Sequence, residues 1–447
     1  MPGTPTRPRV GVVLLAGSLA LVWVTAFLGP SAASKQLAGA GALPPWSLDT
    51  RPHDGLVTGL LFGWVVLGVV GVLLLWRALA AGWAPSPRRL LAAALLATAA
   101  FAVVPPVTND DVVSYAAYGR MVVLRYDPYT TSPAELGRTG DPVGQEVGRP
   151  WRDSPSVYGP VATAQQAAVM WVAGDSLRTG VALLSLLGAL AYAGTLLLVD
   201  RLAGASDERR RRALLLFGLN PFVLVHLVAG ALGAAAGCVK LTGALAGLAL
   251  AWSERAAPRR LAALALGAGL VAAPAYLAAG GWTALTQARR ASRFVSFATP
   301  WRPVTSGLEQ LWDSTSVRRV ITVAALLLVA WLARLLARAL PAGDDAVRAT
   351  AVLALAWVLG AAYVLPWYDA FAWLPLALLP ASRWDRLLLA HTAYLSFAYL
   401  PGRNIALDPV LTSVMGHVRG TGGPVVLGVV LVAAVVLARR SSPTLAA

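Results

Sequence analysis

Apolar segments about as long as a membrane is thick recur along the whole chain, and they restrict its fold more than any other feature. The runs 10–28 and 56–76, for example, contain no charged residue. A helix needs roughly 20 apolar residues to cross a hydrocarbon core, and in lipid the helix satisfies its own backbone hydrogen bonds. With 57% hydrophobic and 13% charged residues, the chain is not a soluble domain with a solvated surface. We predict an all-α, polytopic transmembrane bundle.

Applying this length to each apolar run predicts about 12 spans, with both chain ends on the same side of the membrane. The run after Arg7 and Arg9 exceeds the usual apolar core of a signal peptide, which favours an uncleaved first helix. The predicted spans are 10–28, 56–76, 89–105, 178–199, 213–230, 232–252, 260–279, 318–339, 346–365, 369–381, 385–401 and 423–438.

The short basic loops orient this bundle. Clusters such as 209–212 and 439–440 fall on the side of the N-terminus, which the positive-inside rule assigns to the cytoplasm. This assignment requires that the helix at 160–173, about 14 residues long and containing two glutamines, lies at the interface or is re-entrant. The net charge of +16 then reflects contact with anionic membrane lipids, not nucleic acid, whose binders gather basic residues on a solvated face.

The longest and most polar loops are predicted on the outer face of a plasma membrane, with cytoplasmic N- and C-termini. They are 29–55, 105–177, 281–317 and 402–422. No internal repeat or low-complexity linker divides the chain, so 1–447 is treated as one integral membrane domain. The loop 105–177 is the first candidate site, with short interfacial helices, and 281–317 is the second outer loop.

Asp110 and Asp111 follow the predicted end of a spanning helix and have two interpretations. A carboxylate held at an interface is able to act as a general base on a hydroxyl group. Alternatively, an aspartate here caps a helix beginning at Val112. Tyr115 and Tyr118 lie with Val112 and Val122 on one face of that helix, which is typical of an interfacial helix, although such aromatic residues also serve simply to pack.

Four arginines, Arg289, Arg290, Arg293 and Arg302, gather in the loop 281–317. Arginine matches phosphate oxygens in a bidentate manner, so the cluster suits a phosphate carried by a lipid. Contact with anionic headgroups explains the cluster equally well.

The sequence has no pattern for a resident cofactor. Its four histidines are scattered, and Cys238 is alone in an apolar run. We predict no cofactor, and a carboxylate-bound Mg²⁺ or Mn²⁺ at Asp110 or Asp111 stays open. Phosphate-cradling Gly-rich and Gly-x-Ser-x-Gly motifs are absent, which argues against nucleotide hydrolysis and serine chemistry.

The order and spacing of residues across 108–160 resemble the first outer loop of the GT-C membrane glycosyltransferases, in particular the actinobacterial polyprenyl-phosphomannose-dependent α-1,6-mannosyltransferases. Two later segments, Asn220-Pro221 with His226 and Pro366-Trp367-Tyr368, also resemble that group. The matching segments of the loop are Asp111-Val112-x-Ser114-Tyr115, Tyr118-Gly119, Asp127-Pro128-Tyr129, Trp151-Arg152-Asp153-Ser154-Pro155 and Tyr158-Gly159-Pro160.

The resemblance implies an inverting enzyme on the outer face that moves a hexose, mannose by this likeness, from a polyprenyl-phosphate donor to a cell-envelope glycan or glycolipid. Asp111 matches the position of the general base, with Asp110 as the alternative. The four arginines are candidates for the donor phosphate by their chemistry only. The other residues expected to bind substrate are Tyr115, Tyr118, Arg120, Tyr129, Trp151, Arg152, Asp153, Tyr158, Trp367 and Tyr368.

One departure from the group follows His226, where relatives carry a His-Asn-Asp cluster and this chain has only apolar residues at 230–234. A catalytically silent scaffold of a cell-envelope assembly is therefore one alternative. A multi-span transporter is another, but such a protein carries internal repeats and ionisable residues at mid-membrane. Lys240 is the clearest ionisable residue here, and we interpret it as a structural or lipid-phosphate contact.

Overall fold

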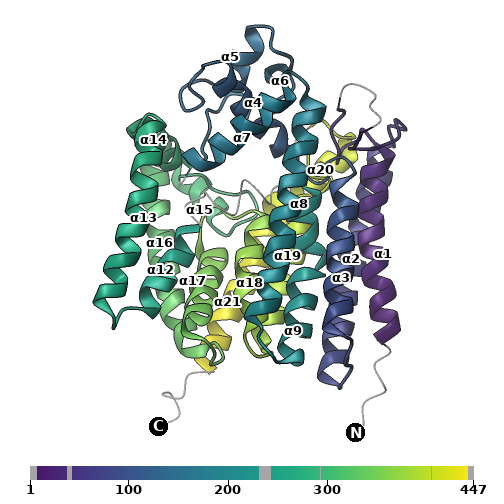
Figure 1. Ribbon diagram of the computed structural model, residues 1–447, viewed down its shortest axis with the longest axis vertical. Coiled ribbons are helices and arrows are strands. Elements are labelled where there is room, and N and C mark those ends of the chain that lie inside the picture. The colour runs from purple at the N-terminus through teal and green to yellow at the C-terminus, as the bar shows by residue number, and fades with distance from the viewer. Residues whose placement is uncertain (1–7, 38–42, 231–242, 292, 404, 441–447) are drawn as a thin grey trace.

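The apolar segments fold into long helices that run side by side through most of the molecule (Figure 1). We describe the protein from a computed structural model that defines residues 8–37, 43–230, 243–291, 293–403 and 405–440. Within these ranges the chain is helical, and its only β pairing is an isolated antiparallel bridge between Ser34 and Val107. The all-α prediction is confirmed.

The first half of the described chain contains α1 Pro8–Leu28, α2 Asp54–Ala80, α3 Pro87–Ala102, α4 Asp111–Val123, α5 Pro133–Arg138, α6 Pro142–Gln145, α7 Pro160–Ala173, α8 Leu177–Leu202, α9 Asp207–Ala213, η1 Leu214–Gly218, α10 Pro221–Leu224 and η2 Val225–Ala229. The second half contains α12 Gly243–Ser253, α13 Pro258–Ala278, α14 Trp282–Ala291, α15 Trp301–Leu308, α16 Ser314–Ala339, α17 Asp345–Gly360, η3 Pro366–Asp369, α18 Ala370–Leu378, α19 Arg383–Ala398, α20 Pro409–His417, η4 Val418–Gly422 and α21 Gly423–Arg440.

Six of the described helices are long and apolar enough to cross a membrane: α1, α2, α8, α13, α16 and the continuous helix Pro409–Arg440. A seventh crossing results if the pair Asp207–Gly218 and Pro221–Ala229, bent by 48°, counts as one span. The predicted number of about 12 is therefore not confirmed. Part of the predicted span 232–252, together with Cys238 and Lys240, lies outside the described residues.

Several remaining apolar runs form helices that are shorter than predicted. The span expected at 346–365 ends as α17 at Gly360, because the residues before Pro366 are extended, as a following proline favours. The run 369–381 likewise contains only the nine residues of α18. A search for apolar length alone does not detect these interruptions.

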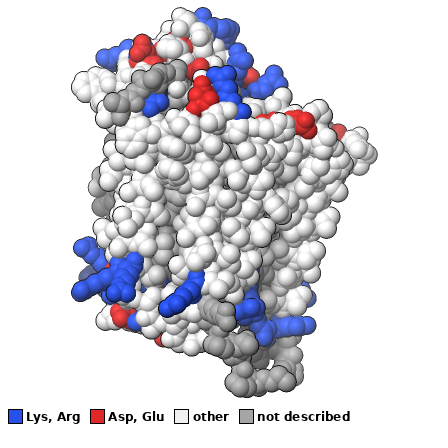
Figure 2. All heavy atoms as spheres, turned by 90° about the vertical axis from the view of Figure 1, so that its right-hand side faces the viewer, with Lys and Arg blue, Asp and Glu red and all other residues white. Residues whose placement is uncertain are grey.

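Charged side chains gather at the two ends of the molecule, and one face between them is almost free of charge (Figure 2). Helices α4 to α7 lie together at one end, above the long helices, whereas α1 begins and α21 ends at the opposite end (Figure 1). An uncharged band between two charged ends is typical of a membrane-embedded protein.

Two predicted outer loops contain more helix than expected. The segment 281–317 includes α14 and α15, and 402–422 includes α20. The helix at 112–125 is also less exposed than predicted for an interfacial helix. It occurs as α4, in which every residue from Asp111 to Gly119 is buried, so its tyrosines pack inside the protein.

Candidate active site

Asp111 is a buried carboxylate at the first residue of α4, with 7% of its surface exposed. Its backbone N–H donates to Oδ1 of Asn109 at 3.2 Å, and its own Oδ1 accepts a hydrogen bond of 2.7 Å from the indole Nε1 of Trp151. The negative charge also lies at the helix N-terminus, where the helix dipole favours an anion. Both effects stabilise an ionised carboxylate at a fixed position.

The segment before α4 is attached to two distant parts of the chain. Val107 donates its N–H to the carbonyl of Ala229 at 2.8 Å, and Thr108 donates to the carbonyl of Ala33 at 3.0 Å. The loop after α19 covers the same segment, since a Cβ added to Gly402, with φ +113°, would lie only 2.1 Å from the carbonyl oxygen of Thr108. Only glycine fits there.

Asp110 is the N-cap residue of α4, yet its side chain makes no capping hydrogen bond. Its Oδ2 lies 3.5 Å from Nε of Arg403, whose Nη1 donates to the carbonyl of Ser31 at 2.9 Å. The capping interpretation is therefore wrong for Asp110, because its carboxylate faces an arginine from another segment. The two neighbouring carboxylates have different partners: Asp110 an arginine, and Asp111 an indole.

Three predicted tyrosines lie together below Asp111. The hydroxyl of Tyr158 donates to that of Tyr115 at 3.2 Å, and the hydroxyl of Tyr118 donates to the carbonyl of Ser154 at 2.9 Å. Burial raises the pKa of Tyr115 and Tyr118, and the charge of Asp111 raises it further. The pKa of Tyr158 is also raised, first by burial, then by the neighbouring Tyr115 and then by Asp111. All three phenols stay neutral at physiological pH.

An aromatic chain connects the two outer loops and the Pro-Trp-Tyr segment. The ring of Trp151 lies 6.5 Å from that of Phe294, which is 5.6 Å from Tyr363, which in turn is 6.1 Å from Tyr368. Trp367 is 6.3 Å from Tyr368. A continuous series of ring contacts thus joins Trp367 and Tyr368 to Trp151.

His226 lies in this part of the core, where its ring is packed and hydrogen bonded. Its Nε2 is hydrogen bonded to Oγ of Ser396 at 2.8 Å, and its ring lies 5.6 Å from Trp64 and 6.4 Å from Trp367. In the Asn220-Pro221 segment, the side chain of Asn220 caps α10 by accepting a hydrogen bond from the N–H of Phe222. Residues 231–234, where the sequence departs from the mannosyltransferase pattern, lie outside the described ranges.

Other predicted binding residues lie further from the carboxylate or have partners of their own. Arg120 forms an ion pair with Asp141 at 2.8 Å, and Tyr129 is hydrogen bonded to Thr163 at 3.0 Å. Arg152 and Asp153 are exposed.

The described arginines of the predicted cluster have different surroundings. Arg290 is exposed, Arg293 is half-buried beside Phe294, and the guanidinium of Arg302 lies 4.8 Å from the ring centre of Phe297. The side chain of Arg289 lies outside the described residues. Of these residues, Arg293 is next in sequence to Phe294, whose ring lies 6.5 Å from that of Trp151.

Among the described residues, no group of three or more His, Cys, Asp and Glu side chains comes together to hold a metal ion. The partners of Asp110 and Asp111 are donors of other kinds, an arginine and an indole.

The family model "Alpha-(1->6)-mannopyranosyltransferase, N-terminal domain" matches residues 12–289, which include the whole loop 105–177. The chain belongs to this family. The resemblance to the α-1,6-mannosyltransferases that the loop motifs indicated is thereby confirmed.

Curated relatives agree with the family match. Alpha-(1->6)-mannopyranosyltransferase B of Corynebacterium glutamicum is 32% identical over 28% of this chain and 21% of its own length. Alpha-(1->6)-mannopyranosyltransferase A of Mycobacterium tuberculosis is 29% identical over 43% of this chain and 39% of its own length. The chain thus aligns with well under half the length of these relatives. No solved structure matches.

Sequence reasoning missed several residues of the site. Arg403, Phe294, Trp64 and Ser396 contact Asp110, Trp151 or His226 from segments distant in sequence. The only sequence signal for Phe294 is its position next to the predicted arginine Arg293. The other three lie in stretches that read as spans or turns, and no local pattern separates them from packing residues.

Proposed function

We propose that this protein is a membrane glycosyltransferase that moves a hexose, mannose by its family, from a polyprenyl-phosphate donor to a glycan or glycolipid acceptor. The observation that carries the proposal is the buried carboxylate of Asp111, held by the Trp151 indole in a chain that belongs to the mannopyranosyltransferase family. The names of the relatives supply the sugar and the α-(1->6) linkage as expectations for this chain.

In the proposed reaction, the acceptor hydroxyl oxygen attacks the anomeric carbon of the donor sugar as the bond from that carbon to the phosphate oxygen breaks. Asp111 takes the hydroxyl proton, and polyprenyl phosphate leaves with the electron pair. One displacement inverts the anomeric centre and needs one base and no covalent intermediate. Charge growing on the phosphate requires a cation, for which Arg293 is the first candidate.

Asp111 suits the role of base better than Asp110. The Oδ2 of Asp110 lies 3.5 Å from a guanidinium group, and Arg403 in turn is attached to the backbone at Ser31. The carboxylate of Asp110 is thus occupied by a cation from another segment, whereas that of Asp111 lies beside an indole and close to the tyrosine hydroxyls. Asp110 is therefore proposed to position the start of α4, and Asp111 to act on the acceptor.

The proposal also includes the orientation of the enzyme. The site lies at the end of the molecule that carries α4 to α7, and the described chain begins and finishes at the other end (Figure 1). We propose that 105–177 forms an outer catalytic loop of a GT-C type bundle, with 281–317 as its neighbour and both termini cytoplasmic.

Transfer of radiolabelled mannose from polyprenyl phosphomannose to an α-mannoside acceptor, measured in membranes, tests the proposal. We expect Asp111→Asn to lose about 10²- to 10⁴-fold in rate, as removal of a general base does. Asp110→Asn is expected to lose less, about tenfold or below, through displacement of α4. Asp175→Asn, an exposed carboxylate of the same loop, is the control and should retain full activity.

Three outcomes contradict parts of the proposal. A severe loss in Asp110→Asn alone moves the base by one residue. Full activity in both variants removes the carboxylates from the chemistry. Absence of transfer by the wild-type protein, with mannose and with other polyprenyl-linked hexoses, overturns the enzymatic function and favours a silent scaffold.

A further inference from the structure

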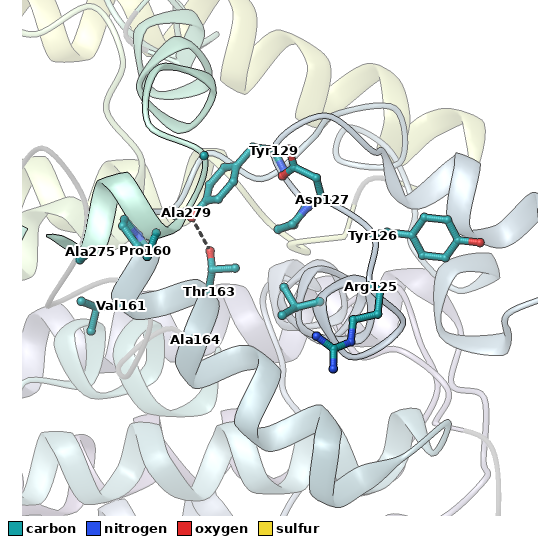
Figure 3. Close-up of a pocket in the computed structure, with 14 residues that line it drawn as sticks. Arg125, Tyr126, Asp127, Tyr129, Pro160, Val161, Thr163, Ala164, Ala275 and Ala279 are labelled. Carbon is teal, nitrogen blue, oxygen red and sulfur yellow. Dashed lines mark hydrogen bonds between the residues drawn. The ribbon is translucent and has the colours of Figure 1, made fainter. Parts of the chain in front are cut away.

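A cavity of about 620 Å³ lies between the helices of the first long loop and α13, apart from the carboxylate site (Figure 3). Three segments line the cavity: the end of α4 with the following turn, the start of α7, and the end of α13. The cavity is open on one side, and its volume is within the roughly 300 to 1,000 Å³ of ligand-binding pockets.

The wall of the cavity consists largely of hydrocarbon. Alanine, valine and proline side chains dominate it, with Ala275, Ala278 and Ala279 contributed by α13. The polar groups of Tyr129 are already paired, since its hydroxyl is bonded to Thr163 and its carbonyl accepts from Gln287 at 2.9 Å. Sugar hydroxyls need polar partners, whereas an aliphatic chain does not, so the cavity favours the chain.

The lining also includes a cation, Arg125, in the turn that ends α4, and a carboxylate, Asp127, whose Oδ1 accepts the N–H of Tyr129 at 2.8 Å. Arg125 has φ +66°, a left-handed conformation that glycine adopts at lower cost, and it closes α4 by donating its N–H to the carbonyl of Val122 at 3.1 Å. Its guanidinium is exposed. An apolar cavity with an exposed arginine suits an amphipathic molecule that has an anionic group at one end of a hydrocarbon chain.

The cavity has a defined position relative to the candidate base. Asp111 and Val122 are eleven residues apart on α4, which corresponds to about 16 Å along the helix axis. The turn at the cavity is connected to the site, since Ser156 donates its N–H to the carbonyl of Pro128 at 2.8 Å. The separation accommodates a sugar and a phosphate between the carboxylate and the cavity.

Helix α13 provides a route from the bilayer to the cavity. It is long and apolar enough to span a membrane, and none of its residues is buried in the protein. A hydrocarbon chain in the bilayer can therefore lie along α13 and reach the cavity at its end without crossing a polar surface.

We propose that this cavity binds the hydrocarbon chain of the lipid-phosphate donor next to its phosphate. The inference rests on the proposed function, because the transferase reaction requires such a donor. The acceptor's own lipid, if it has one, is separated from the reacting hydroxyl by its glycan and has no reason to lie this close to Asp111.

The test fills the cavity and compares two donors. Ala278→Phe places a ring in the cavity, and Ala273→Phe places the same ring on the exposed surface of α13 outside the lining. With a long-chain polyprenyl phosphomannose, we expect Ala278→Phe to raise the donor KM by about tenfold. With a donor whose phosphate carries a methyl group in place of the polyprenyl chain, and for the acceptor KM, both variants should match the wild-type protein.

A second measurement separates failure of this inference from failure of the proposed function. A diazirine-bearing polyprenyl phosphate should label the cavity segments 122–129 and 275–280 in the wild-type protein, and polyprenyl phosphate should compete. Labelling without any mannose transfer supports the chain site and overturns the enzyme. Transfer with an unchanged KM in Ala278→Phe overturns the chain site alone. Better competition by a diacyl glycolipid assigns the cavity to another lipid and also overturns the inference.

Discussion

At the scale of single residues, the site depends on the different surroundings of two adjacent carboxylates. Asp110 faces Arg403, and Asp111 accepts from Trp151. The sequence shows two aspartates in a polar loop and identifies Trp151 by its motif. It does not show Arg403, which lies almost three hundred residues away. The resemblance therefore suggests Asp111 as the base, whereas the contacts that distinguish it from Asp110 come only from the structure.

Trp151 provides the first prediction at this scale. Trp151→Phe keeps an aromatic ring beside Phe294 and removes the N–H that reaches Asp111. A hydrogen bond to a charged group contributes about 1.5 to 3 kcal/mol, so kcat is expected to fall by roughly 10- to 100-fold with little change in either KM. The indole N–H stabilises the ionised carboxylate, and its loss should shift the acidic limb of the pH–rate profile to higher pH.

Trp171→Phe is the matched control, since Trp171 lies on α7 with 78% of its surface exposed. Equal activity of the two variants would show that the indole does not orient the base. A rise in donor KM at constant kcat would instead make Trp151 a binding residue.

At the scale of elements, the first long loop functions as a packed unit because α4 and α7 approach closely. The Tyr118-Gly119 motif explains this contact. A Cβ added to Gly119 would lie 2.2 Å from the backbone oxygen of Gln166 on α7. The sequence predicted helices near these positions, the first interfacial and the second interfacial or re-entrant, and it gave no sign of their close packing.

Gly119→Ala is therefore predicted to destabilise the protein. Neither helix backbone can move by the required distance without disturbing the Tyr115 and Tyr158 contact, so the cost is at least about 2 kcal/mol. We expect a lower Tm of the detergent-solubilised protein and a lower yield of folded protein.

Gly194→Ala is the comparison, because Gly194 lies in α8 with open space around its Cβ position. It should be neutral or stabilise by up to about 1 kcal/mol, the helix preference of alanine over glycine. Equal Tm values for the two variants would show that α4 and α7 are not held at the described distance.

At the scale of the whole molecule, the sequence predicted the helical class and the polar end but not the number of long spans. The basic cluster 209–212 illustrates why. Arg210 pairs with Asp200 at 2.8 Å, and Arg212 pairs with Asp385 at 2.7 Å in a buried contact between α9 and α19. These arginines contribute to tertiary structure as well as to orientation in the membrane. The pair Arg212 and Asp385, 173 residues apart, has no local pattern in the sequence.

Orientation in the membrane is the last prediction. If the end with α4 to α7 faces outward, a cysteine at Thr139, exposed beside α5, reacts with a membrane-impermeant maleimide on intact cells. A cysteine at Glu208, exposed on α9 at the other end, reacts only after permeabilisation. Both changes are made in a Cys238→Ser background, so each variant carries a single thiol.

The labelling pattern also shows from which side of the membrane a donor reaches Asp111. Polyprenyl-phosphate sugars with their headgroups on the outer face reach Asp111 only in the predicted orientation. The reverse pattern, with Glu208→Cys labelled and Thr139→Cys protected, would place the carboxylate in the cytoplasm. The basic residues near Arg440 would then lie outside, against the positive-inside rule, and a cytoplasmic donor would replace the one proposed here.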